Sequence, residues 1–392
     1  MTTSIASIAV VIFIAALAPI LASIVGRAVK IPLVVFEIAL GIIAGPSVLG
    51  WVKPNDILTA LSNFGLVLLF FMAGNEIDFV KIRGRALNRA TFGWLISLVV
   101  GVALGIVLAG GSLNGVFVGI ALTSTALGTI MPMLRDAGEL STPFGRAVTA
   151  VGAAGEFGPL LAISLFLSGR RPLAAAAVLI AFVVISGLAI WFAMRRPHKR
   201  LDALVTASLR TSGQFAVRLV ILVVVALVSL SLVFGLDMLL GAFAAGILCR
   251  ALLRDTSEPD KITVERKLEA ISFGFFVPIF FITTGVTFDL SALLTDPHSL
   301  LLLPIFLALL LIVRGIPGAL AAPPGATRAD RRSLLLFAAT GLPIIVAVTD
   351  IGLDEKALQP GTAAALVGAG MLSVLLFPAL ALLGRSPAKK LQ

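Results

Sequence analysis

Apolar runs long enough to cross a lipid bilayer follow one another along almost the whole chain. A run of about 20 apolar residues crosses the hydrocarbon core as an α-helix, because a helix makes its backbone hydrogen bonds within the segment. The composition agrees, since 59% of the 392 residues are hydrophobic and 13% are charged. Soluble domains contain about 25% charged residues. A transmembrane β-barrel would show segments of about 10 residues with alternating polarity, so we expect an all-α polytopic membrane protein.

Prolines, glycines and charge clusters divide these runs into thirteen expected transmembrane helices. They cover residues 5–26, 31–50, 58–78, 90–110, 113–134, 144–168, 172–194, 215–234, 236–253, 267–288, 298–322, 332–351 and 361–384. With the N-terminus outside, the inner loops and the C-terminal tail hold 24 of the Lys and Arg residues, and the outer loops hold 4. Basic residues favour the cytoplasmic side. We therefore expect an outside N-terminus and a cytoplasmic C-terminus. We also expect the chain to lie in the inner membrane of a prokaryotic cell. The basic residues indicate this topology and not a nucleic-acid partner.

An internal repeat is visible in two of the expected helices. "FFMAGNEIDF" and "FFITTGVTFDL" each contain a Phe pair, a Gly and an Asp four residues after it, namely Gly74 with Asp78 and Gly285 with Asp289. The expected helix before each one carries a glycine pair, which suits close helix packing. We expect a single membrane domain over 1–392, with repeats at about 1–168 and 215–384 joined by a helix at 172–194. An offset of seven helices inverts the second repeat, as is typical of secondary transporters. The alternative is a duplicated channel-like fold.

Two of the expected helices contain residues that interrupt a helix near its middle. They are Thr123, Ser124, Thr125, Gly128 and Pro132 in 113–134, and Thr340, Gly341 and Pro343 in 332–351. A broken helix exposes backbone polar groups that lipid cannot satisfy, and its ends carry partial charge. Two broken helices that cross beside a carboxylate could bind a small cation or a proton. The alternative is a pair of ordinary proline kinks whose hydroxyls bond back to their own helices.

Two charged residues lie deep within expected helices, Glu156 in 144–168 and Arg314 in 298–322. A charge at the bilayer centre costs about 2.5–3.5 kcal/mol on insertion scales, so we expect the two residues to lie near each other or beside the breaks. A proton and a cation could then compete for Glu156. The alternative is a static Glu156–Arg314 ion pair that holds the repeats together. For Glu37, about seven residues into its own helix, we favour a packing hydrogen bond over a role in transport.

Five stretches together resemble the transmembrane domain of the monovalent cation:proton antiporter-2 family, which is related to sodium/proton exchangers and Kef-type potassium efflux systems. They are "IPLVVFEIALGIIAGPSVLGW", "LSNFGLVLLFFMAGNEIDF", "ALTSTALGTIMPMLRDAG", "GLDMLLGAFAAGILCRALL" and "LEAISFGFFVPIFFITTGVTFDL". The resemblance implies a dimerising scaffold and a mobile core made of the expected helices in 90–168 and 298–384. It also implies that the broken helices cross at the site and that Arg314 takes part.

The sequence departs from the family in two ways. Such antiporters usually carry an Asp-Asp, Asn-Asp or Gln-Asp pair where this chain has Gly155-Glu156. Kef-type proteins commonly continue into a soluble nucleotide-binding domain, whereas this sequence stops at Gln392 after "GRSPAKKLQ". We therefore expect no soluble regulatory domain.

The residues and the resemblance together predict a secondary transporter that exchanges Na⁺ or K⁺ for protons, without a cofactor. The resemblance implies that it works by alternating access and as a homodimer in the bilayer. Glu156 would bind the cation or the proton, and Arg314 would be its counter-charge. Oxygen ligands would come from Thr123, Ser124, Thr125 and Thr340. The alternatives are a sodium-coupled organic-anion symporter and a non-transporting member of the fold. We do not expect an enzyme, because His198 and His298 lie in or beside loops and neither HExxH nor GxSxG is present.

Overall fold

The computed structural model describes residues 2–25, 32–77, 82–140, 142–167, 172–195, 214–254 and 257–383. Within these ranges all regular structure is helical. Ten of the described helices are long and apolar enough to cross a membrane, and three shorter apolar helices cover Leu33–Ala44, Gly115–Met131 and Met238–Leu252. Each expected helix overlaps one of these segments. The all-α membrane fold is confirmed, while the number of thirteen spanning helices stays a prediction.

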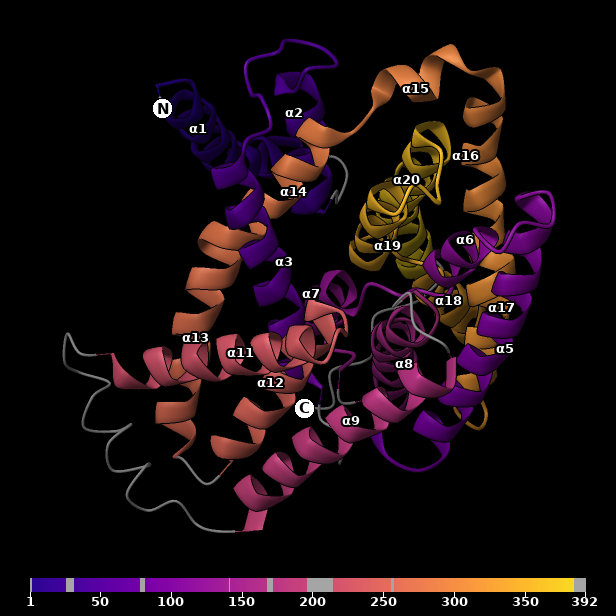
Figure 1. Ribbon diagram of the computed structural model, residues 1–392. Coiled ribbons are helices and arrows are strands. Elements are labelled where there is room, and N and C mark those ends of the chain that lie inside the picture. Colours follow the sequence, from indigo (N-terminus) through magenta and orange to yellow (C-terminus); the bar gives the residue numbers. More distant parts are fainter. Residues whose placement is uncertain are drawn as a thin grey trace. The chain divides into compact units, whose positions relative to one another are not determined.

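Figure 1 labels the main helices in chain order. The first half contains α1 (Thr2–Val25), α2 (Leu33–Ala44), α3 (Asp56–Glu76), α5 (Arg85–Leu108), α6 (Gly115–Leu122), α7 (Leu127–Asp136), α8 (Pro143–Phe166) and α9 (Pro172–Arg195). The second half contains α11 (Phe215–Val233), α12 (Met238–Leu252), α13 (Glu258–Ile271), η1 (Ser272–Phe276), α14 (Val277–Thr287), α15 (Leu290–Thr295), α16 (Pro297–Leu309), η2 (Leu310–Gly315), α17 (Ile316–Gly318), η3 (Ala319–Ala321), α18 (Arg328–Ala338), α19 (Pro343–Asp354) and α20 (Pro360–Leu383). The segments η1 and η2 are π-helical and η3 is a 3₁₀ turn.

The chain forms two compact units. One unit comprises Met1–Asn55, Asp78–Ala162 and Phe281–Gln392, and the other comprises Asp56–Ile77 and Ile163–Phe280. Each unit therefore draws helices from both expected repeats. The division of the sequence into repeats at 1–168 and 215–384 stays a prediction.

Glycines allow two equivalent helix contacts, one in each unit. In the first unit α2 packs against α14, where a methyl group on Gly41 would overlap the Ile282 carbonyl oxygen and one on Gly285 would overlap that of Ile38. In the second unit α3 packs against α12, and methyl groups on Gly74 and Gly246 would overlap carbonyl oxygens of the facing helix.

Both contacts pair the second expected helix of one repeat with the third expected helix of the other. The glycines that carry the sequence repeat are therefore packing positions. Of the two repeated aspartates, Asp289 accepts a hydrogen bond from the Ala292 N–H at 2.8 Å and caps α15. Asp78 lies outside the described residues.

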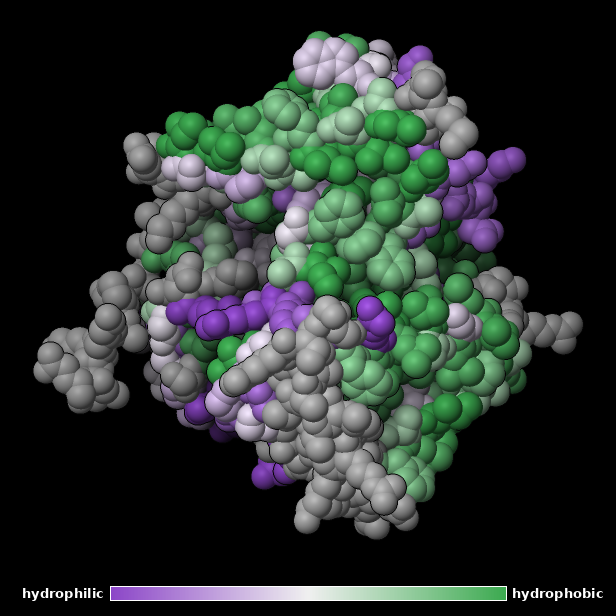
Figure 2. All heavy atoms as spheres, turned by 90° about the vertical axis from the view of Figure 1, so that its left-hand side faces the viewer, coloured by the Kyte–Doolittle hydropathy of each residue, from purple (hydrophilic) through white to green (hydrophobic). Residues whose placement is uncertain are grey.

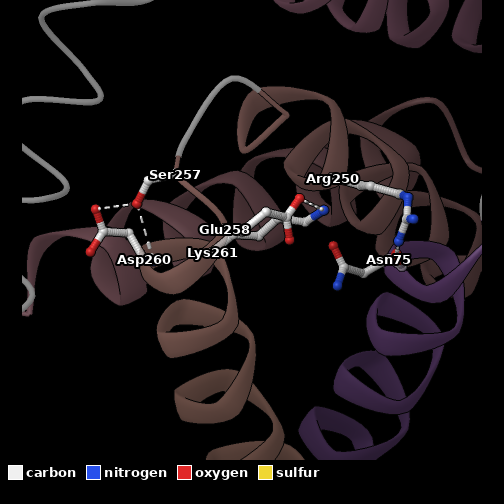
Figure 3. Close-up of polar contacts among 6 residues, drawn as sticks. All are labelled: Asn75, Arg250, Ser257, Glu258, Asp260 and Lys261. Atoms are coloured by element: carbon white, nitrogen blue, oxygen red, sulfur yellow. Dashed lines mark hydrogen bonds and ion pairs between the residues drawn. The ribbon is translucent and has the colours of Figure 1, made fainter.

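The polar contacts drawn in Figure 3 lie at helix ends of the second unit. Arg250 Nη1 donates to the Asn75 carbonyl near the end of α3 at 2.7 Å, where the last carbonyls of a helix favour a cation. Ser257 accepts a hydrogen bond from the Asp260 N–H at 3.4 Å at the start of α13, and Lys261 lies 4.0 Å from Glu258. The part-buried Arg250 contact therefore satisfies a carbonyl at the end of α3, whereas an exposed ion pair such as Lys261–Glu258 adds little to stability.

Many large apolar side chains are exposed along the helices. Val99 is 71% exposed, Phe13 64% and Leu222 64%. Figure 2 shows hydrophobic residues over much of one face. Lipid is as apolar as these side chains, so their exposure is what a helical membrane protein requires.

Candidate functional site

Two helices are interrupted inside the first unit. The first break lies at Thr123–Ala126, between α6 and α7, and the second lies at Ala339–Leu342, between α18 and α19. Thr123, Ser124 and Thr340 are each no more than 1% exposed. Both interruptions are therefore buried in protein, which is the condition for irregular backbone at membrane depth.

Hydrogen bonds join the two breaks directly. The Ala126 N–H donates to the Thr340 carbonyl at 2.7 Å, and the Thr125 hydroxyl donates to the Ala338 carbonyl at 2.7 Å. A methyl group on Gly341 would lie 2.8 Å from the Ser124 hydroxyl oxygen. The two broken helices therefore meet at their breaks, as expected.

The other hydroxyls at the breaks bond back to their own helices. Thr123 donates to the Ile120 carbonyl and Ser124 to the Ala121 carbonyl, both at 2.8 Å. Thr340 donates to the Leu336 carbonyl at 3.0 Å. A hydroxyl that donates its hydrogen keeps its oxygen lone pairs as acceptors, so all three oxygens can still serve as ligands.

Glu156 holds the start of α7. Its Oε1 accepts hydrogen bonds from the Leu127 N–H at 2.8 Å and the Gly128 N–H at 3.3 Å, and the residue is 5% exposed. These N–H groups have no partner within α7, because the first turn of a helix leaves its donors unpaired. The carboxylate therefore lies at the positive end of the α7 dipole.

Arg314 approaches the same break from the π-helical segment η2. It is fully buried, its Nε donates to the Thr125 hydroxyl oxygen at 2.8 Å and its Nη2 donates to the Val151 carbonyl at 2.6 Å. Within the part of the chain that the structure describes, its Nη1 has no hydrogen-bond partner. Single π-helical turns inside α-helices occur frequently at functional sites.

Gly155 allows the two charges to converge on the break. Its carbonyl accepts a hydrogen bond from the Thr125 N–H at 3.0 Å. A methyl group at this position would overlap Thr125 and Nη2 of Arg314. Gly155 directly precedes Glu156, so this geometry agrees with the expectation that Glu156 and Arg314 lie close to the breaks. The functional roles of the two residues stay predictions.

The interrupting residues lie partly elsewhere than the sequence suggested. The first break precedes Gly128 and Pro132, both of which lie inside α7, so the expectation of a break at these two residues needs correction. The groups freed at Thr123–Ala126 find partners on α8 and on the second broken helix, which places the break there. The second break contains Gly341 as expected, and Pro343 is the first residue of α19, a position that proline favours.

Three groups that form hydrogen bonds at the site were not predicted from the sequence. The Leu127 N–H and the Val151 carbonyl are backbone groups, which no residue type marks. Ser373 of α20 accepts a hydrogen bond from the Gly341 N–H at 3.1 Å. It is the one hydroxyl residue in the apolar run 363–383, a signal that could have pointed to a buried polar contact.

Comparison with known proteins agrees with this architecture. A family model described as "Sodium/hydrogen exchanger, transmembrane" matches residues 12–382. The chain is 27% identical over 96% of its length to a putative Na(+)/H(+) antiporter, YjbQ, from Bacillus subtilis. It is 31% identical over 66% of its length to the Na(+)/H(+)-K(+) antiporter GerN from Bacillus cereus. The matches span 62% of YjbQ and 66% of GerN.

A solved structure shares the fold. The sodium proton antiporter MjNhaP1 from Methanocaldococcus jannaschii superposes with a TM-score of 0.65 at 15% sequence identity, over 95% of each chain. At this identity the likeness concerns the fold alone.

Proposed function

Because the chain belongs to the sodium/hydrogen exchanger family of membrane transporters, we propose that it exchanges a monovalent cation, Na⁺ or K⁺, for protons by alternating access. One observation carries this proposal: the buried Glu156 carboxylate lies at the N-terminus of a broken helix, within a cluster that also holds Arg314. Related proteins named as Na(+)/H(+) antiporters support the proposal of cation/proton exchange.

In this proposal Glu156 binds either the proton or the cation. A proton neutralises the carboxylate directly, and a cation does so electrostatically, so the two compete for one group. Oxygens of Thr123, Ser124, Thr125 and Thr340 would complete the cation site. Arg314 would balance the carboxylate charge while neither ligand is bound. The N–H groups of α7 stabilise the ionised form at the same time.

The proposal extends to the assembly of the whole chain. We propose a single transport domain built from two inverted repeats, in which helices of 90–168 and 298–384 move as a core against a scaffold that dimerises. The excess of basic residues in one set of loops supports a cytoplasmic C-terminus and an outside N-terminus. The chain would act as a transporter in a prokaryotic inner membrane and not as an enzyme.

The test is cation-driven proton movement in proteoliposomes. Purified protein is reconstituted with a pH-sensitive dye inside, and Li⁺, Na⁺, K⁺ and Rb⁺ are added in turn. The wild type should dissipate a pH gradient with one or more of these cations. Glu156→Gln and Glu156→Ala should abolish the response. Glu37→Gln is the matched control, because Glu37 is also a buried carboxylate, 3% exposed, but lies in α2 and in neither broken helix.

Two results would contradict the proposal. Continued exchange by both Glu156 variants would show that Glu156 is a helix cap or an ion-pair partner and not the exchanging group. Sodium-dependent uptake of an organic anion without proton movement would favour a symporter.

A further inference from the structure

Ser373 forms hydrogen bonds with the backbone of the second break. The residue is fully buried in α20. Its oxygen accepts a hydrogen bond from the Gly341 N–H at 3.1 Å. Its hydroxyl lies 3.1 Å from the Gly341 carbonyl oxygen and 2.7 Å from the Gly370 carbonyl oxygen, and can donate to either. A close approach of α20 makes this possible, since a methyl group on Gly370 would lie 3.0 Å from the Gly341 carbonyl oxygen.

The Gly341 N–H belongs to the same peptide group as the Thr340 carbonyl. A peptide group is planar and rigid. Ser373 binds the N–H side of this plane at 3.1 Å, and the Ala126 N–H binds its carbonyl side at 2.7 Å. Fixing one side of the plane therefore fixes the other.

The hydrogen bond of Ala126 connects this peptide group to the Glu156 site. Ala126 is the residue directly before α7, and the next two N–H groups, of Leu127 and Gly128, donate to Glu156. An unbroken line of hydrogen bonds and rigid backbone thus runs from Ser373 through the Thr340–Gly341 peptide to the start of α7. Glu156 and Ser373 have similar positions, because each belongs to the helix that follows a broken helix. Glu156 accepts from the two N–H groups directly after the first break, and Ser373 accepts from the Gly341 N–H within the second.

We propose that Ser373 is a positioning residue for the Glu156 site: by orienting the Thr340–Gly341 peptide it holds the α7 N-terminus where Glu156 and the cation meet. This inference rests on the proposed function for its effect on transport, but its structural part does not. Ser373 is not ionisable in the physiological range, so the second break is held by a group that keeps its charge state throughout the exchange cycle.

The experiment compares Ser373→Ala with Ser333→Ala. Ser333 is the matched control, because it is 2% exposed and its hydroxyl donates to the Ala381 carbonyl at 2.7 Å. This bond joins α20 to the body of α18 and not to the second break. In proteoliposomes, Ser373→Ala should raise the half-saturating cation concentration about tenfold, the effect of one lost hydrogen bond. Its maximal rate should change less than twofold, and Ser333→Ala should change neither quantity.

A third variant separates hydrogen bonding from packing. Ser373→Cys nearly keeps the side-chain volume but offers only a weak donor and acceptor, so it should behave like Ser373→Ala. A wild-type half-saturating concentration in Ser373→Cys would overturn the proposal, because packing alone would then suffice. Equal effects of Ser373→Ala and Ser333→Ala would overturn it as well.

Hydrogen–deuterium exchange provides a readout that does not depend on transport. Ser373→Ala should increase deuterium uptake in peptides covering 121–130 and 338–345, and Ser333→Ala should leave both unchanged. If the wild type moves no protons in response to any cation, the transport proposal fails while this comparison still decides the role of Ser373. Unchanged uptake at 121–130 in Ser373→Ala would refute the link between the two breaks.

Discussion

Glu156 illustrates how far a single charged residue can be interpreted from sequence. Its depth in an apolar run predicted that it needs a partner, and Arg314 was the obvious candidate by charge. The structure adds a partner that carries no charge of its own, the pair of N–H groups at the start of α7. Arg314 meanwhile donates to Thr125 and Val151. Both charges therefore lie at the first break, as expected, but their individual backbone partners could not be predicted, because backbone groups leave no mark in a sequence.

Gly155 offers a test at the residue scale. We expect Gly155→Ala to impair cation/proton exchange at least tenfold, because the added methyl group would displace Thr125 and Arg314, and such overpacking costs about 1–3 kcal/mol. Exchange in proteoliposomes and the thermal midpoint in detergent are the measurements.

The matched control is Gly187→Ala in α9, where a methyl group would meet nothing within 4 Å. It should leave exchange unchanged and stabilise the helix slightly, since alanine is the better helix former by about 1 kcal/mol. Equal activity of the two variants would refute the close approach at Gly155.

At the scale of elements, the broken helices were predictable in kind but not in detail. Clusters of Thr, Ser, Gly and Pro within apolar runs indicated both interruptions. The first break lies at the predicted Thr123–Thr125 cluster and not at Gly128 or Pro132, because a break forms where its freed groups find partners. Those partners lie on helices far away in the sequence, as the contacts of Ala126 with Thr340 and of Thr125 with Ala338 illustrate.

The α3–α12 contact gives a prediction at this scale. Gly74→Ala and Gly246→Ala should each destabilise the protein by about 1–3 kcal/mol, because each methyl group would overlap a backbone oxygen of the facing helix. The double variant should lose less free energy of unfolding than the two single variants lose together, since the first methyl group already separates the helices. Unfolding in detergent measures both effects.

Gly274→Ala is the control for this contact, because a methyl group there would meet nothing within 4 Å. Strict additivity of the Gly74 and Gly246 variants would argue against one shared contact.

At the scale of the whole molecule, the proposed role of Glu156 as the single exchanging carboxylate would make the exchange electroneutral, with one cation moved for each proton. We expect the cation gradient at which net proton movement stops to stay constant when a membrane potential is imposed. Moving one net charge across 100 mV is worth about 2.3 kcal/mol, a shift of about fiftyfold that the vesicle assay would detect. A null point that moves with the potential would contradict one-for-one exchange.

The fold of the whole chain was largely predictable, because lipid leaves few alternatives to apolar helices. The repeated glycines at Gly74 and Gly285 were found by pattern, and the structure gives them their physical meaning as helix contacts. The division into two compact units was not predictable, since it depends on packing between helices of different repeats and not on their order along the chain.

The bond between the Ala126 N–H and the Thr340 carbonyl has one more consequence. Backbone that is left open in the middle of a membrane attracts water, and a continuous file of water conducts protons. The two breaks pair some of their backbone hydrogen-bonding groups with each other, and Glu156 and Ser373 accept hydrogen bonds from further backbone N–H groups. At the two breaks, groups of the protein thus make hydrogen bonds that water would otherwise make. Fewer open backbone groups leave fewer attachment points for a file of water, and this opposes proton leak.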